Sequence, residues 1–170
     1  AAPHQSGKDE YLMILIILAL DVDVCYLSAK WTMRRIPNPF EKSKDIDDQG
    51  IKWPLGWLQE IIFRKFGAIP VDRKGNSGQY DSVIEELKKR DSFLLIVTPE
   101  GRFDATRFRT SFLFIAKELN AEVMPVQIDY ENEIFNILES FNIEGDTESV
   151  VKNLRLKFDG VKGKKSRFKA

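Results

Sequence analysis

The spacing of apolar residues along the chain predicts a regular succession of helices and strands. Helices are expected in five segments, most of them with apolar positions three and four residues apart, at residues 8–20, 54–66, 79–90, 110–119 and 146–158. Short apolar runs bounded by turn residues, which are typical of strands, lie at residues 22–28, 68–71, 93–97, 122–129 and 133–141. Because strands alternate with helices, we expect an α/β fold, a layered domain with a central, mostly parallel or mixed sheet flanked by helices.

Two of the predicted helices have an unusual distribution of apolar residues. Residues 8–20 are apolar on all sides, which is typical of a helix that is buried or faces lipid. Residues 54–66 combine aromatic residues such as Trp57 and Phe66 with a neighbouring arginine and lysine, a composition that suits a membrane interface. The same residues also fit a helix whose aromatic side chains pack in the core beneath a solvated basic face.

A polar segment interrupts this succession after the first strand. Residues 30–51 contain two prolines and an acidic run at residues 45–48, so we expect an inserted loop over about residues 34–51. The chain shows no internal repeat. Its length and its ordinary globular composition, 43% hydrophobic and 31% charged, predict one domain over residues 1–170.

The charge balance limits the classes of partner. Lysine and arginine together number 26, as do aspartate and glutamate, so no overall positive field indicates a nucleic acid. Local clusters must carry any anion binding, and residues 162–169 form a basic tail. The single Cys25 lies in an apolar run, where we expect a buried, reduced thiol rather than a nucleophile. One histidine and one cysteine do not make a zinc cluster, so we expect no metal.

No predicted segment is long enough to span a bilayer. The longest uncharged apolar run, residues 11–20, would extend about 15 Å as a helix, about half the hydrocarbon thickness of a membrane. No cleavable signal peptide is visible in the sequence. Any contact with a membrane is therefore expected at its surface.

Candidate chemistry begins with the only histidine, His4, which precedes Asp9 by five residues. An imidazole with a pKa near its ordinary value of about 6.5 can take a proton from a hydroxyl at neutral pH, and a carboxylate beside it fixes the tautomer. Residues 6–9, Ser-Gly-Lys-Asp, also fit a capping box at the start of the following helix. The pair alone therefore leaves a catalytic and a structural interpretation open.

Three later segments extend this observation. They are residues 67–73 (Gly-Ala-Ile-Pro-Val-Asp-Arg), 98–102 (Thr-Pro-Glu-Gly-Arg) and 123–126 (Val-Met-Pro-Val). In this order the four segments resemble the motif blocks of the lysophospholipid or glycerol-phosphate acyltransferase family, in the manner of 1-acylglycerol-3-phosphate acyltransferases. The resemblance covers the chain from Ala2 to about Phe168.

The resemblance implies a reaction and the residues that carry it. A fatty acyl group passes from acyl-CoA or acyl carrier protein to the hydroxyl of a lysophospholipid such as 1-acylglycerol 3-phosphate, without an acyl-enzyme and without a cofactor. His4 is then the general base and Asp9 its orienting partner. The acceptor phosphate lies against residues of the second and third blocks, where guanidinium groups form bidentate contacts: Arg73, Glu100, Gly101 and Arg102. Further candidates for contacts with phosphate, headgroup or acyl donor are Lys74, Arg107, Arg109 and Pro125.

A lipid acceptor also implies a membrane as partner. We expect the protein to bind the membrane surface peripherally, on the cytoplasmic side. In the family a strand leads into the histidine motif, and we expect that such a strand, or a membrane-anchoring helix, precedes Ala1. The oligomeric state, the acyl chain length and the acceptor headgroup stay open.

The chain departs from the family pattern at three positions. The third block lacks the threonine usual between its glycine and arginine, Ser111 stands where a glycine is usual, and Lys8 replaces an aromatic residue. These departures concern the identity of the acceptor more than the type of reaction. Two other functions remain open, namely a catalytically degenerate family member that binds anionic lipid without turnover and a hydrolase that uses the same base on water.

Overall fold

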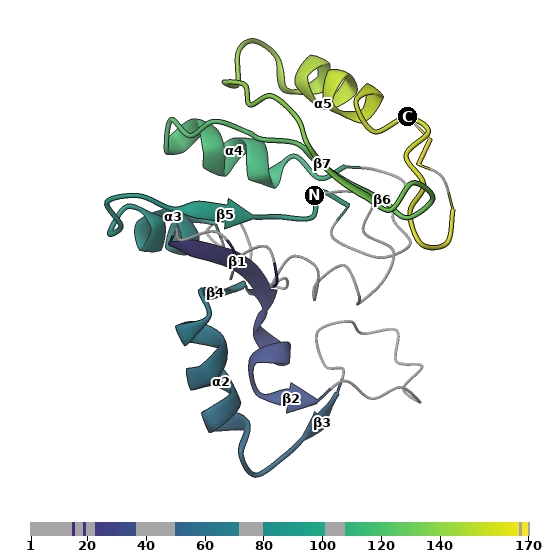
Figure 1. The fold of residues 1–170 in the computed structure, drawn as a ribbon. Coiled ribbons are helices and arrows are strands. Elements are labelled where there is room, and N and C mark those ends of the chain that lie inside the picture. The colour runs from purple at the N-terminus through teal and green to yellow at the C-terminus, as the bar shows by residue number, and fades with distance from the viewer. Residues whose placement is uncertain are drawn as a thin grey trace. The chain divides into compact units, whose positions relative to one another are not determined.

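The computed structural model describes residues 23–36, 50–71, 80–100, 108–166 and 168–169, together with the helical residues Leu15 and Ala19. These two residues belong to the predicted helix at 8–20, the rest of which lies outside the described residues. Contacts divide the chain into two compact units. We call Val22–Ile96 the sheet unit, and Val97–Ala170 with Ala1–Asp21 the hairpin unit. Figure 1 shows the elements of both.

A three-stranded parallel sheet forms the centre of the sheet unit. Strand β1 (Val24–Ala29) lies between β4 (Ala68–Val71) and β5 (Leu94–Ile96), as Figure 1 shows. Tyr26 pairs with both neighbouring strands, and all three strands run in the same direction. Parallel neighbours need crossover connections, which the chain makes through the helices that follow β1 and β4.

Helix α3 (Asp81–Leu87) connects β4 to β5 along the chain and buries the side predicted from its apolar spacing. Val83 and Leu87 have no exposed surface, and Ile84 is also buried. Asp81 in the first turn interacts favourably with the positive end of the helix dipole. The predicted stripe of the segment 79–90 is thus confirmed, over a shorter helix.

Helix α2 (Gly56–Lys65) leads into β4 through a turn that requires glycine. Gly67 has a φ of +82°, and a Cβ atom at this position would lie 2.1 Å from the carbonyl oxygen of Val24. The Gly67 carbonyl accepts a hydrogen bond from the backbone N–H of Tyr26 at 3.0 Å. The turn after α2 is therefore joined directly to β1, and a side chain there would separate the two.

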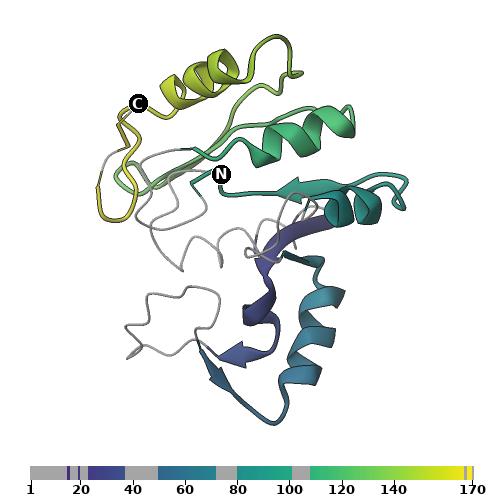
Figure 2. The same cartoon turned by 180° about the vertical axis from the view of Figure 1, so that it is seen from behind.

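The ends of the predicted inserted loop are not irregular. A 3-10 helix, η1 (Lys30–Met33), follows β1, and β2 (Arg35–Ile36) pairs with β3 (Ile51–Lys52) in antiparallel fashion. Figure 2 shows this pair from behind, beside α2. Residues 37–49 lie outside the described residues. The sequence did not predict the pair because strands of two residues produce no periodic pattern.

The hairpin unit contains two helices and one antiparallel strand pair. Helix α4 (Ser111–Glu118) precedes the hairpin of β6 (Val126–Asp129) and β7 (Ile134–Ile137), and α5 (Thr147–Leu156) follows it. Asp146 caps α5 as predicted, because its carboxylate accepts two backbone N–H groups of the first turn at 3.0 and 2.9 Å.

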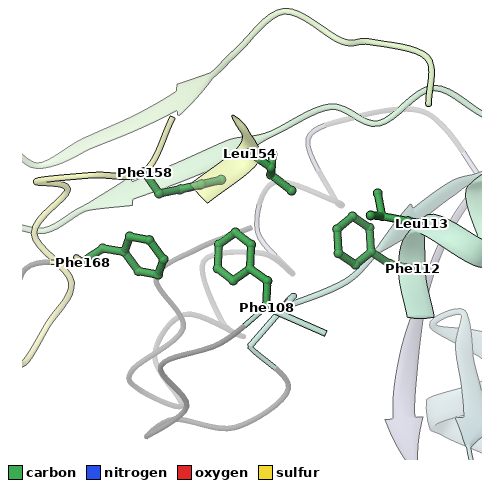
Figure 3. Close-up of a cluster of buried hydrophobic side chains, with 6 residues drawn as sticks. All are labelled: Phe108, Phe112, Leu113, Leu154, Phe158 and Phe168. Carbon is green, nitrogen blue, oxygen red and sulfur yellow. The ribbon is translucent and has the colours of Figure 1, made fainter. Parts of the chain in front are cut away.

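An aromatic cluster forms the core of the hairpin unit. Its six buried residues come from α4, α5 and the segments beside them (Figure 3): Phe108, Phe112, Leu113, Leu154, Phe158 and Phe168. The rings of Phe108 and Phe158 meet edge to face with centroids 5.7 Å apart, a favourable geometry for aromatic pairs. Phe168, in the predicted basic tail, is buried in this cluster, and its backbone N–H bonds the carbonyl of Val161 at 2.8 Å. The tail is thus held to the unit at Phe168.

The α/β class and the parallel sheet flanked by helices are confirmed. Two strand predictions need correction. Strand β5 is shorter than predicted, Leu94–Ile96 instead of residues 93–97, and it is half-buried along its length. Strand β6 begins at Val126, later than predicted, because Pro125 has no N–H to continue the ladder, and before it only Val123 forms a bridge, with Phe141.

Candidate functional site

The strands that lead into the second and third motif blocks end at one edge of the parallel sheet. Strand β4 ends at Val71, two residues before Arg73, and β5 ends at Ile96, two residues before Thr98. Only β1 separates them, so the two strands lie about 10 Å apart at the usual strand spacing. Val71 pairs with Ala29 and Ile96 with Tyr26, so β5 ends three residues before β4 along the strand direction. Ligand sites of open α/β sheets form at this edge. Both strands therefore end at the edge of the sheet where such sites usually form.

Glu100 in the third block is buried, with 3% of its surface exposed. Among the residues that the structure describes, it is the only buried side chain with a charge. Burial of a carboxylate is costly unless the surroundings compensate its charge. Its burial therefore distinguishes Glu100 from a solvated surface charge.

The loop that carries the rest of the third block is closed at its base. The backbone N–H of Arg109 donates to the carbonyl of Pro99 at 2.7 Å, and both residues belong to the hairpin unit. Next to this bond, Phe108 inserts its ring into the aromatic cluster. The Arg109 side chain is exposed, so it is available to a ligand but not held toward one.

Pro125 in the fourth block has a structural position. It is buried, and its carbonyl accepts the N–H of Leu138 at 2.9 Å at the start of the β6–β7 hairpin. A proline is tolerated at this point because a strand can begin after it. The described surroundings of Pro125 thus explain its presence by the shape of the strand.

The remaining predicted site residues lie outside the described residues, so their contacts stay predictions. They are His4, Asp9, Arg73, Lys74, Gly101, Arg102 and Arg107.

Cys25 is not a nucleophile. The thiol is fully buried in β1, and its sulfur lies 3.7 Å from the carbonyl oxygen of Leu94, to which it donates a weak hydrogen bond. Burial raises the pKa of the Cys25 thiol to about 11, against a smaller opposing effect of Arg90. The thiolate is therefore scarce at neutral pH, and the predicted buried, free cysteine is confirmed.

The sequence did not single out Gln59, which joins α2 to the segment after β1. Its Oε1 accepts the indole N–H of Trp53 at 2.7 Å, and its Nε2 donates to the carbonyls of Thr32 at 2.7 Å and Arg35 at 3.1 Å. The available signal was a glutamine in a predicted helix that is mostly apolar. Such a residue, when it is turned inward, needs partners for its amide.

In the part of the chain that the structure describes, no cluster of histidine, cysteine and acidic side chains is arranged to hold a metal ion. Within the same residues, no helix has both the length and the apolar character needed to cross a membrane.

Residues 50–129 match the family model described as Acyltransferase. The matched segment contains β4, β5 and the second, third and fourth motif blocks, and it ends with β6. This segment belongs to the acyltransferase family, which confirms the family predicted from the order of the motifs. The corresponding activity is acyl transfer by a transferase enzyme. No match was found among curated proteins or among solved structures.

Proposed function

We propose that the protein moves a fatty acyl group from acyl-CoA or acyl carrier protein to the hydroxyl of a lysophospholipid. The acceptor that we propose is 1-acylglycerol 3-phosphate. The acyltransferase match over residues 50–129 carries this proposal. The common sheet edge at which β4 and β5 end supports it, because the acceptor-binding blocks follow these two strands. No cofactor takes part.

In this reaction His4 is the general base. One imidazole nitrogen takes the proton of the acceptor hydroxyl while the oxygen attacks the thioester carbonyl, and Asp9 holds the other nitrogen. The tetrahedral intermediate collapses, the carbon–sulfur bond breaks, and the imidazolium returns its proton to the thiolate that leaves. An ester and a free thiol result, and neither serine nor cysteine carries the acyl group.

The acceptor phosphate binds at the second and third blocks. Arg73 and Arg102 offer planar guanidinium groups that fit two phosphate oxygens each. Glu100 and Gly101 directly precede Arg102 and position it, and the burial of Glu100 supports this role. Lys74, Arg107 and Arg109 add positive charge near the headgroup.

The lysolipid acceptor resides in a bilayer, so the enzyme works at the membrane surface. We place it on the cytoplasmic side, where acyl-CoA and acyl carrier protein are supplied. The acyl chain of the acceptor then remains in the lipid while its headgroup enters the site.

The test combines an acyl-CoA donor, a panel of lysolipids and the variant His4→Ala. Turnover with 1-acylglycerol 3-phosphate should fall at least about a hundredfold in the variant, the usual effect of a lost general base. The neighbouring Gln5→Ala serves as the control and should keep its turnover. Equal turnover in His4→Ala would remove His4 from the mechanism. Acyl-CoA cleavage without a new ester would favour a hydrolase, and lipid binding without turnover a degenerate family member.

A further inference from the structure

The outward side of helix α2 is apolar although it faces solvent in the sheet unit. Trp57 is 58% exposed and Phe66, just after the helix, is 56% exposed. Four aliphatic residues on or beside the same helix are also exposed, at 38 to 45%: Leu55, Leu58, Ile61 and Ile62. We call these six residues the α2 face. The core-packing interpretation of this segment is therefore wrong for Trp57 and Phe66.

The inward side of α2 consists of the buried Gly56 and the half-buried Gln59, Glu60 and Phe63, and it is fixed in place. Gly56 is buried, and a Cβ there would lie 2.6 Å from the carbonyl oxygen of Arg34. Gln59 forms its three hydrogen bonds with the body of the unit on this side. Glu60 pairs with Arg34, and also with Arg64 at 2.9 Å. The contacts of Gly56, Gln59 and Glu60 with residues outside the helix set its rotation, so the outward position of the α2 face is a property of the fold.

An apolar face held outward in this way needs an apolar environment to cover it. The charges beside the α2 face indicate which apolar environment covers it. Residues 50–66 carry three basic residues and one acidic residue, Glu60, which is already paired with two arginines. The positive balance complements an anionic surface.

Lys65 favours a lipid surface over a second copy of the chain as the partner that covers the α2 face. It is exposed, and it follows Ile61 and Ile62 by four and three residues, so it lies beside the α2 face on the same side of the helix. Lysine is depleted from the dry centres of protein interfaces. At a bilayer, its stem lies along apolar surface while the ammonium group reaches the headgroups. Exposed tryptophan is likewise enriched at this depth.

We infer that the α2 face is the surface through which the protein docks on an anionic bilayer. This inference deepens the proposed function and rests on it for the expectation that the acceptor is a membrane lipid. Helix α2 continues through Gly67 into β4, which ends two residues before Arg73. The docking helix is thus joined directly to the strand that precedes the second motif block.

Co-sedimentation of the full chain with vesicles of phosphatidylcholine and phosphatidylglycerol tests the inference, without any acyl donor. The double variant Trp57→Ser/Ile61→Gln should lower the vesicle partition coefficient at least about tenfold, because it removes two large apolar contacts. The matched control, Ile134→Gln/Ile137→Gln, changes two side chains of β7 that are 53% and 52% exposed, and should partition within about twofold of the unmodified chain. Lys65→Gln should lower partition about fivefold at low salt and less at high salt.

Three results would overturn the inference: no vesicle binding by the unmodified chain at low salt, equal binding by Trp57→Ser/Ile61→Gln, or a stable dimer in sedimentation velocity that this variant dissolves. Circular dichroism checks that each variant is folded, and Lys65→Gln offers a milder second test. Transfer to a short-chain, micelle-free lysolipid distinguishes the two proposals. Vesicle binding without any transfer contradicts the proposed function alone, whereas transfer without vesicle binding contradicts the docking face alone.

Discussion

Replacement of Gln59 by methionine removes the contacts that fix helix α2 in the sheet unit while keeping the length of the side chain. The variant loses the bond from the Trp53 indole at 2.7 Å and the bonds to the carbonyls of Thr32 and Arg35 at 2.7 and 3.1 Å. Methionine cannot donate to either carbonyl, and its sulfur accepts only weakly.

The expected loss follows from these three bonds. Each contributes about 0.5–1.5 kcal/mol to the free energy of unfolding. The groups are only partly buried, so water replaces some of the lost partners, and we expect a total near the lower end, about 2 kcal/mol. With a urea m-value of about 2 kcal/mol/M, the midpoint should fall by about 1 M.

Urea unfolding followed by tryptophan fluorescence measures this loss. The three tryptophans, Trp31, Trp53 and Trp57, all lie in the sheet unit, so the signal reports on the unit that α2 belongs to. Lys89→Met is the control, since it removes only an exposed ion pair with Glu86 and should cost less than about 0.5 kcal/mol. A midpoint for Gln59→Met equal to that of the control would refute the role of Gln59 in holding the helix.

Three further predictions concern the core, the pH dependence and the acceptor site. Phe158→Ala truncates a side chain that is 2% exposed and leaves a cavity in the aromatic cluster. The free energy of unfolding, measured by calorimetry, should fall by about 3–4 kcal/mol. The hydrogen bonds from Arg34, and then from Arg64, lower the pKa of Glu60, so its stabilising contribution is present above about pH 4.3 and is lost as the pH falls through the folded-state pKa. The stability difference between the unmodified chain and Glu60→Gln should therefore shrink below that pH, and a difference that grows on acidification would contradict this. Lysine at Arg73 or Arg102 should raise the KM for the acceptor, because a point charge does not replace a bidentate fork; a change confined to the donor's KM would move the arginines to the acyl-CoA site.

The sequence predicted those elements whose burial follows their own periodicity. Strand β4 was predicted with its observed bounds because it is a short, continuous apolar run that is buried on both faces. The stripe of α3 was predicted because this helix packs one apolar side against its unit. Helix α2 was predicted too, but the sequence did not predict which side of the helix faces outward. That direction depends on Gln59 and Gly56, whose partners lie more than twenty residues away in the chain. Periodicity carries no information about such partners.

The candidate site was predictable from its motifs to a similar extent. The order of the blocks predicted the family, and the strands predicted before two of the blocks are present in the parallel sheet. The burial of Glu100 and the bond that closes the third-block loop, from Arg109 to Pro99, were not predictable. Phe108, the neighbour of Arg109, packs in the aromatic cluster, and no local pattern indicates tertiary packing of this kind.

The identity of the product tests the proposed function most directly. The unmodified chain is incubated with acyl-CoA and 1-acylglycerol 3-phosphate in phosphatidylglycerol-containing vesicles. The free thiol that is released is measured with a colorimetric reagent, and the lipids are identified by mass spectrometry. The proposed reaction predicts one molecule of 1,2-diacylglycerol 3-phosphate for every thiol released, and no thiol release when the acceptor is omitted. Thiol release that yields free fatty acid, or no diacyl product with any lysolipid of the panel, would contradict it.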